Sequence, residues 1–258
     1  MIGAIAGDII GSVYEHAPLK SKDFPLFGRG CRFTDDTVLT IAVAAAILTG
    51  RPYRETLREF GQRYPAAGYG GSFYRWLQAE NPQPYNSWGN GAAMRVSPVG
   101  FACATAAEVL AEAARSAACT HNHPEGIKGA QAAALAVFLA RTGNSREEIR
   151  AEIATRFGYD LSRTVAAIRP GYSFDISCQG TVPEALIAFL DSTSYEDAIR
   201  NAVSLGGDSD TLACISGGIA ETFYGGVPAA IAGPAIQYLT PDLRRVYEQF
   251  YRQYDMIK

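Results

Sequence analysis

The amino-acid sequence predicts an all-α protein folded as a single domain over residues 1–258. Long Ala-rich segments carry apolar residues at helical spacing, and Gly stands at the ends of many of them, as in closely packed helices with tight connections. Strand patterns are poor, because no apolar–polar alternation is sustained and no Asn-Gly or Asp-Gly turn joins two β-branched runs. No linker, internal repeat or low-complexity tract divides the chain, so one large core is expected.

The first half of the chain contains a segment that is expected to lie at the centre of the fold. Residues 37–49 are apolar nearly all round and stop at Gly50, which predicts a buried helix. Amphipathic or Ala-rich helices are expected at four further places, namely 52–64, 72–79, 104–119 and 125–141. The stretch 65–91 is rich in Gly, Pro, Asn and aromatic residues, a composition typical of a functional surface loop.

Helix ends are easier to recognise in the second half. The capping box Ser145-Arg-Glu-Glu148 begins a helix that ends at Gly158. Thr240-Pro241 places an N-cap and a first-turn proline before a final helix over 241–254. Three helices are expected between these two: 181–191, opened by Thr-Val-Pro-Glu, then 194–205, and a second nearly all-apolar helix, 210–224.

Charge and hydropathy exclude several classes of protein. Lys and Arg number 23 against 26 Asp and Glu, and no basic run occurs, so bulk nucleic-acid binding and membrane-surface binding are not expected. The N-terminus has no cationic region and carries Asp8 inside its apolar stretch, unlike a signal peptide. The longest apolar run is too short to cross a bilayer. We therefore expect a soluble, cytoplasmic protein that acts as a monomer.

Histidine and cysteine are scarce and badly spaced for metal binding. The chain has three His and five Cys, with no Cys-x-x-Cys pair and no two His four residues apart. These counts rule out a zinc ribbon and argue against a disulfide framework. Any metal ion would have to be held by oxygen ligands.

Two short acidic stretches are the candidates for such a site. One is Arg32-Phe-Thr-Asp-Asp-Thr37 and the other is Gly206-Gly-Asp-Ser-Asp-Thr211, and each lies directly before a nearly all-apolar helix. Taken singly, either stretch is explained by helix capping, since Thr and Asp are favoured N-caps and acids suit the first turn. A cap needs only one side chain, however, and adjacent buried carboxylates need a cation or hydrogen bonds to stay ionised.

The two stretches would meet if the two apolar helices packed side by side. Four carboxylates and two Thr hydroxyls would then face one another, a donor set suited to Mg²⁺, Mn²⁺ or Ca²⁺ and not to zinc or copper. The EF-hand spacing is absent. So many ligands exceed what one octahedral ion usually takes from a protein, which predicts two ions.

At these residues the sequence resembles the ADP-ribosylglycohydrolase family. The similar segments are GAIAGDIIGSVYE at 3–15, FTDDT at 33–37, SWGNGAAMRVSPVG at 87–100, THNHPEGIKGA at 120–130, GTVPEALIAFL at 180–190 and SLGGDSDTLACISGGIAETFYGGVP at 204–228. They follow the family order and cover nearly the whole chain. The resemblance implies a compact, single-domain orthogonal helix bundle and an enzyme that removes ADP-ribose from a modified acceptor.

The resemblance also implies roles for particular residues. The ligands of a binuclear Mg²⁺ (or Mn²⁺) centre would be Thr34, Asp35, Asp36, Asp208, Asp210 and Thr211. Contacts to ADP-ribose would come from the loop Ser87, Trp88, Gly89, Asn90 and Gly91, which holds the pyrophosphate, and from His121. Trp88 or Tyr85 would stack on adenine, and Asn90 would shape the loop. Asp8 is expected to be a structural hydrogen-bond acceptor.

The expected reaction is attack of water on C1 of the terminal ribose, with the ribose diol held at the cations. Asp36 or Glu15 would activate the water or protonate the leaving group, and Asp35 is expected to be essential. The partner would be an ADP-ribosylated protein, with arginine as the first acceptor considered; serine-linked, nucleic-acid-linked and O-acetyl conjugates stay open. A two-metal phosphoester hydrolase and a non-catalytic, crystallin-like or ADP-ribose-binding member are the alternatives.

Overall fold

The computed structural model describes residues 1–254, and within them the regular structure is helical, without a β-strand. The all-α prediction is therefore confirmed. Residues 255–258 of the predicted domain 1–258 lie outside the described residues. The final helix, predicted over 241–254, ends at Gln253. The elements are α1 (Ile2–Gly11), α2 (Asp35–Thr49), α3 (Tyr53–Arg63), α4 (Gly71–Gln78), η1 (Asn90–Ala92), α5 (Ser97–Ala102), α6 (Ala106–Ala118), α7 (Pro124–Arg141), α8 (Arg146–Phe157), α9 (Val165–Ile168), α10 (Cys178–Leu190), α11 (Tyr195–Val203), α12 (Ser209–Phe223), α13 (Ala229–Tyr238) and α14 (Pro241–Gln253).

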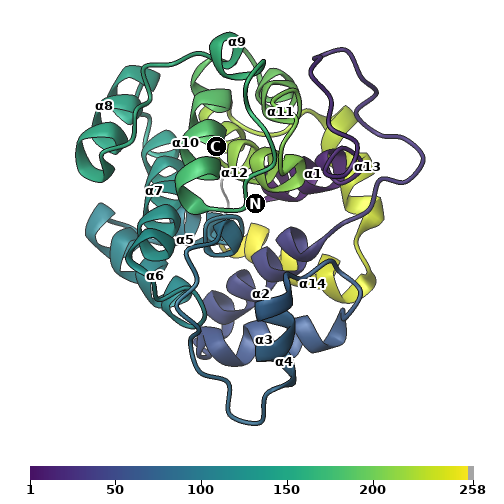
Figure 1. Cartoon of the computed structure of the whole chain (residues 1–258). Helices are drawn as coiled ribbons and strands as arrows, with labels where there is room; N and C mark the ends of the chain where they lie inside the picture. Colours follow the sequence, from purple (N-terminus) through teal and green to yellow (C-terminus); the bar gives the residue numbers. More distant parts are fainter. Residues whose placement is uncertain (255–258) are drawn as a thin grey trace.

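Helices α1 and α12 form the centre of the molecule, and the other helices surround them (Figure 1). Every residue of α1 is buried. Gly3, Gly7 and Gly11 recur at four-residue spacing and line one side of α1. A Cβ built on Gly7 would lie 2.1 Å from the carbonyl oxygen of Ala213, so the two backbones are in direct contact. The absence of side chains on this ridge is what lets α1 approach α12 so closely.

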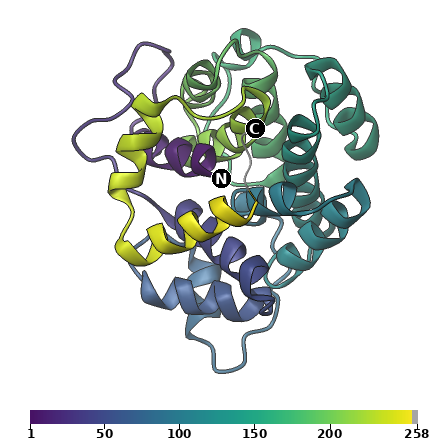
Figure 2. The same ribbon diagram turned by 180° about the vertical axis from the view of Figure 1, so that it is seen from behind.

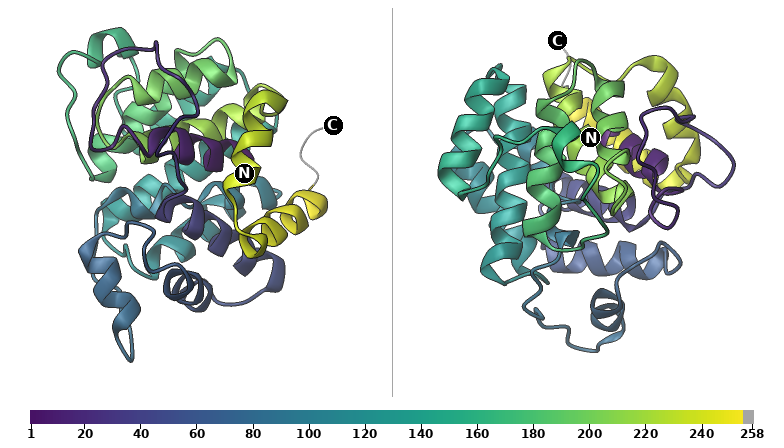
Figure 3. Two further views of the ribbon diagram at one scale, coloured as in Figure 1. Left: turned by 90° about the vertical axis from the view of Figure 1, so that its right-hand side faces the viewer. Right: turned by 45° about the horizontal axis from the view of Figure 1, so that its top comes forward.

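The remaining helices cover this pair on several sides. From behind, α14 lies across α2, while α13 packs on α1 (Figure 2). The hairpin of α6 and α7 flanks the side opposite α13, and α3 packs below α2 with α4 beneath it (Figure 3). Within the described residues, no helix is both long and apolar enough to cross a membrane.

All ten helices expected from the sequence are present, with one substantial correction. Helix α10 begins at Cys178 and not at Thr181, because the Ser177 hydroxyl caps it by accepting the N–H of Gly180 at 2.9 Å. The Thr181 hydroxyl instead donates to the carbonyl of Asp175. Sequence reasoning missed α1, α5, α9 and α13; the glycines of α1 are poor helix formers, and only its packing against α12 explains the helix.

Candidate active site

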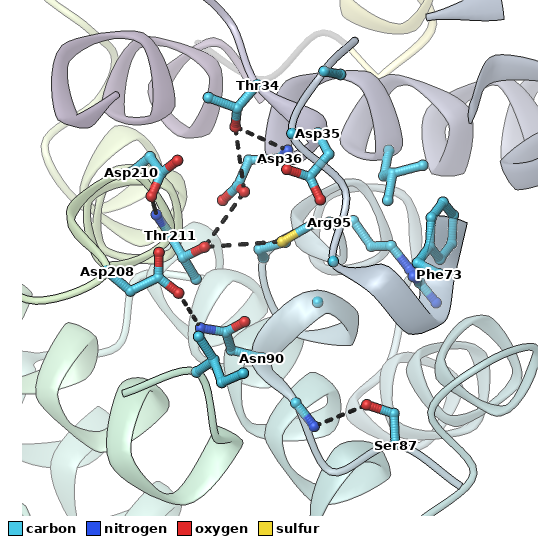
Figure 4. Close-up of a pocket in the computed structure, with 18 of the residues that line it drawn as sticks. Thr34, Asp35, Asp36, Phe73, Ser87, Asn90, Arg95, Asp208, Asp210 and Thr211 are labelled. Carbon is cyan, nitrogen blue, oxygen red and sulfur yellow. Dashed lines mark hydrogen bonds between the residues drawn. The ribbon is translucent and has the colours of Figure 1, made fainter. Parts of the chain in front are cut away.

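The two acidic stretches meet at the N-terminal ends of α2 and α12 (Figure 4). Asp36 lies in the first turn of α2, and Asp210 lies in the first turn of α12. The Thr211 hydroxyl donates to a carboxylate oxygen of Asp36 at 3.3 Å, joining the two helix ends. The juxtaposition expected from the sequence is thus present in the structure.

Helix capping explains only part of this arrangement. Thr34 does cap α2, because its hydroxyl accepts the N–H of Asp36 at 3.3 Å. Asp208 occupies the N-cap position of α12, but its side chain makes no cap hydrogen bond. Its carboxylate instead accepts from the Asn90 amide at 2.6 Å. The acids at the start of α12 are therefore not accounted for by capping.

Asp8 of α1 is a third contributor, which sequence reasoning had treated as structural. Its carboxylate accepts the N–H and the hydroxyl of Thr34, at 2.9 and 2.7 Å, and the N–H and hydroxyl of Thr37. These four bonds fix the start of α2, as a structural role requires. The Thr34 hydroxyl donates its proton to Asp8 and accepts the backbone N–H of Asp36 with one lone pair. Its second lone pair is therefore free to bind a cation.

Carboxylate oxygens gather in two overlapping groups. Oxygens of Asp8, Asp36 and Asp210 lie within 4.8 Å of one another, and so do oxygens of Glu15, Asp208 and Asp210. Among the described residues, no Lys, Arg or His forms an ion pair with any of the four Asp of these groups. Glu15 meets only the exposed His16, at 3.5 Å.

No ion pair within the described residues neutralises the four Asp of these groups, and hydrogen bonds offset only part of their charge. Burial, and then repulsion from Asp210, raise the pKa of Asp8 to about 7. The same two causes raise the pKa values of Asp36 and Asp208 well above their usual range. One oxygen of Asp36, Oδ1, is buried without any hydrogen-bond partner. An all-oxygen donor set with excess negative charge fits hard divalent cations.

A pocket of about 380 Å³ extends from these acids. Its lining includes every predicted site residue except Trp88: Glu15, Thr34, Asp35, Asp36, Tyr85, Ser87, Gly89, Asn90, Gly91, His121, Asp208, Asp210 and Thr211. The Trp88 side chain is 47% exposed and does not line the pocket. Phe174 and Ile176, which the sequence did not suggest, line it and are about half exposed.

The loop 87–91 is tied to α10 and to the acids. The Asn90 N–H donates to the carbonyl of Ile176 at 2.8 Å, and the Trp88 carbonyl accepts the N–H of Cys178 at 3.0 Å. The Gly89 N–H donates to the Ser87 hydroxyl at 3.1 Å. The N–H groups of Gly89 and Asn90 are therefore used within the protein. Asn90, expected to shape this loop, donates its side-chain amide to both Asp208 and Thr181 and so connects the loop to α10 and to the acids.

Comparison with known proteins decides the family. The family profile described as ADP-ribosylglycohydrolase matches residues 1–255. The chain belongs to the ADP-ribosylglycohydrolase family. Members of this family act on ADP-ribosylated substrates, so the resemblance noted in the sequence is confirmed and the chain is an ADP-ribosylglycohydrolase-type enzyme.

Individual relatives of this ADP-ribosylglycohydrolase are distant but extensive matches. The human ADP-ribosylhydrolase ARH3 is 26% identical over 87% of this chain and 84% of its own. The ADP-ribosylarginine hydrolase Tri1 of Serratia proteamaculans is 25% identical over 87% of this chain and 70% of its own. A solved structure titled ADP-ribosylglycohydrolase-related protein complex superimposes with a TM-score of 0.73 at 24% identity, covering 98% of this chain and 97% of that one. This structural match shows that the chain has the same fold as that protein.

Sequence reasoning missed several groups that line the ADP-ribosylglycohydrolase pocket. Arg95 and Phe73 line it, as does Arg32 beside the acids. Arg95 is fully buried, and an Arg inside an Ala-rich segment was the available signal.

Proposed function

We propose that this enzyme hydrolyses the bond between C1 of the terminal ribose of ADP-ribose and an acceptor, at a site for two divalent cations, Mg²⁺ or Mn²⁺. The observation that carries the proposal is the set of buried Asp carboxylates at one end of a pocket, which form no ion pair within the part of the chain that the structure describes. The pocket continues past Ser87–Gly91 to His121 and Tyr85, which provides room for a nucleotide beyond the acids.

The proposed cation ligands are Thr34, Asp35, Asp36, Asp208, Asp210 and Thr211. When bound, the cations supply positive charge that neutralises these groups and polarises the ribose hydroxyls and water. Asp8 and Asn90 hold two of the ligands in place through the hydrogen bonds to Thr34 and Asp208. Ionised carboxylates beside C1 stabilise the positive charge that develops as the bond to the acceptor breaks.

Glu15 is the proposed group for proton transfer. It is partly exposed at the pocket mouth, and burial followed by the charge of Asp210 raises its pKa. A carboxyl with a raised pKa is suited to exchange a proton near neutral pH. Asp36 is fully enclosed by α2 and α12 and is better placed to hold a cation than to exchange protons with solvent.

Arginine is the first acceptor we propose, supported by the relative named ADP-ribosylarginine hydrolase. The second candidate is an ADP-ribose conjugate with another acceptor. It is supported by the ARH3 relative, which matches over a larger share of its own length, and by Arg32. Arg32 lines the pocket with Glu15, and its positive charge opposes a guanidinium acceptor.

A panel of ADP-ribosylated acceptors, assayed with Mg²⁺ and with EDTA, tests the proposal. We expect release of free ADP-ribose from one linkage class, only with the cation. Release of AMP would instead indicate a phosphoester hydrolase, and tight ADP-ribose binding without turnover would indicate a binding protein.

The Asp35→Asn variant provides the site-specific test. We expect it to lose ADP-ribose release while its circular dichroism spectrum stays that of the wild type, because Asp35 is only partly buried at the pocket. Full activity in this variant would contradict the proposed cation site.

A further inference from the structure

Arg95 is a buried cation that has no counter-ion among the described residues. Its side chain is fully buried beside the pocket, and its Nη2 donates to the carbonyl of Ser116 at 3.1 Å and to the Thr120 hydroxyl at 2.9 Å. Its Nε and Nη1 have no partner among the described residues. Burying an unpaired charge is costly, so the position of Arg95 requires an explanation, and the two hydrogen bonds that it makes indicate one.

The Thr120 hydroxyl connects Arg95 to His121. The Thr120 Oγ1 lies 2.7 Å from the Nδ1 of His121, and both residues are buried. Arginine can only donate, so it occupies one lone pair of Oγ1. If Nδ1 also donated to Oγ1, the hydroxyl proton of Thr120 would need a third partner in a buried position. The arrangement is satisfied when Thr120 donates to Nδ1, which leaves the single ring proton of His121 on Nε2.

Tyr85 is a competing acceptor near Thr120. Thr120 lowers the pKa of the Tyr85 hydroxyl, although burial dominates and raises it to about 12. An imidazole nitrogen is a far stronger base than a phenol oxygen, and it lies at the short distance of 2.7 Å. The Thr120 proton therefore goes to Nδ1.

The other side of the His121 ring faces the loop glycines. A Cβ on Gly91 would lie 3.1 Å from Nε2, and one on Gly89 would lie 3.7 Å from it. Because neither residue has a side chain, Nε2 is reached directly from the pocket that His121 lines. Burial, and then the charge of Arg95, lower the pKa of His121 well below its usual range, so the ring stays neutral.

We propose that Arg95 and Thr120 are positioning residues that hold His121 as the neutral Nε2–H tautomer, so that the ring donates a hydrogen bond to an oxygen of the bound ligand. The identity of that ligand as ADP-ribose rests on the proposed function, whereas the tautomer does not. Arg95 acts through Thr120, and its charge serves to orient a hydroxyl and to keep an imidazole unprotonated.

The tautomer is measured directly on the ¹⁵N-labelled full chain without ligand. Long-range ¹H–¹⁵N correlation spectra separate protonated from unprotonated ring nitrogens, and the His121→Asn variant assigns the signals among the three His. We expect His121 to be protonated on Nε2 alone between pH 6 and pH 8. Protonation on Nδ1, or on both nitrogens at pH 7, would overturn the proposal.

Variants of Thr120 link the tautomer to binding. Thr120→Val keeps the side-chain shape but removes the hydroxyl, so we expect mixed tautomers and a roughly tenfold weaker affinity for ADP-ribose by calorimetry. Thr120→Ser should restore the wild-type tautomer and affinity. Tyr85→Phe, followed by the spectra alone, should leave the tautomer unchanged. A Thr120→Val variant with an unaltered tautomer would overturn the proposal. A wild-type chain with the expected tautomer that neither binds nor releases ADP-ribose would contradict the proposed function instead.

Discussion

The buried carboxylates of the site differ in how many hydrogen bonds each receives. Asp8 accepts four, from Thr34 and Thr37, and these bonds oppose the burial that raises its pKa to about 7. Asp36 receives a bond only at Oδ2, from the Thr211 hydroxyl, and its Oδ1 has no partner. The difference supports the proposal that Asp8 holds the start of α2 while Asp36 binds a cation, because an ion would supply the missing partner.

Asp36→Asn should abolish ADP-ribose release and yet stabilise the EDTA-treated protein at pH 8. Burial and then Asp210 raise the pKa of Asp36, and each unit of such a shift corresponds to about 1.4 kcal/mol at a pH where the group is forced to ionise. Removing the charge relieves that cost, and calorimetry should show a higher Tm. Glu80→Gln, at an exposed acid outside the pocket, is the control and should change neither property. A lower Tm with retained activity would contradict the prediction.

Asn90→Ala should weaken cation binding more than it slows the saturated enzyme. The Asn90 amide orients Asp208 through a 2.6 Å bond, and the loss of such a supporting bond typically costs roughly 10- to 100-fold in metal affinity or activity. When activity is titrated against Mg²⁺, the concentration that gives half-maximal activity should rise in Asn90→Ala. The exposed Asn81→Ala should follow the wild-type curve. An unshifted curve for Asn90→Ala would show that Asp208 needs no support from the loop.

At the scale of helices, the close crossing of α1 and α12 sets the geometry of the site. Gly7 and Gly11 of α1 lie against Ala213 and Ser209 of α12, directly beside the acids that each helix contributes. The four-residue spacing of the glycines is visible in the sequence. It indicates a close helix contact only when the partner helix is known, and local sequence pattern does not identify that partner. This is why the two acidic clusters and Asp8 as a hydrogen-bond acceptor could be predicted from local pattern, while α1 and the partners of Asp8 could not.

Gly7→Ala should destabilise the fold and impair the site together. The added Cβ would lie 2.1 Å from a backbone oxygen of α12, so the helices must separate, and overpacking of this kind costs about 1–3 kcal/mol. Gly233→Ala is the matched control, since Gly233 lies within α13 with no atom within 4 Å of a built Cβ. It should change stability much less than Gly7→Ala, because the gain in helix propensity is offset by the restriction that Pro234 places on the residue before it. Urea unfolding would measure both; equal effects would contradict the close crossing.

Across the whole molecule, the acids should make stability depend on pH and on divalent cations. Burial and repulsion from Asp210 raise the pKa of Asp8 to about 7 and that of Asp36 well above its usual range, against about 3.9 in the unfolded chain. From pH 5 to pH 8 the folded, EDTA-treated protein must release protons that the unfolded chain has already lost, so its free energy of unfolding falls as pH rises. Cations bind the ionised carboxylates. Saturating Mg²⁺ should therefore raise the calorimetric Tm more at pH 8 than at pH 5, and much less in Asp36→Asn at either pH. An equal rise at both pH values in the wild type would show that these carboxylates do not bind the ion.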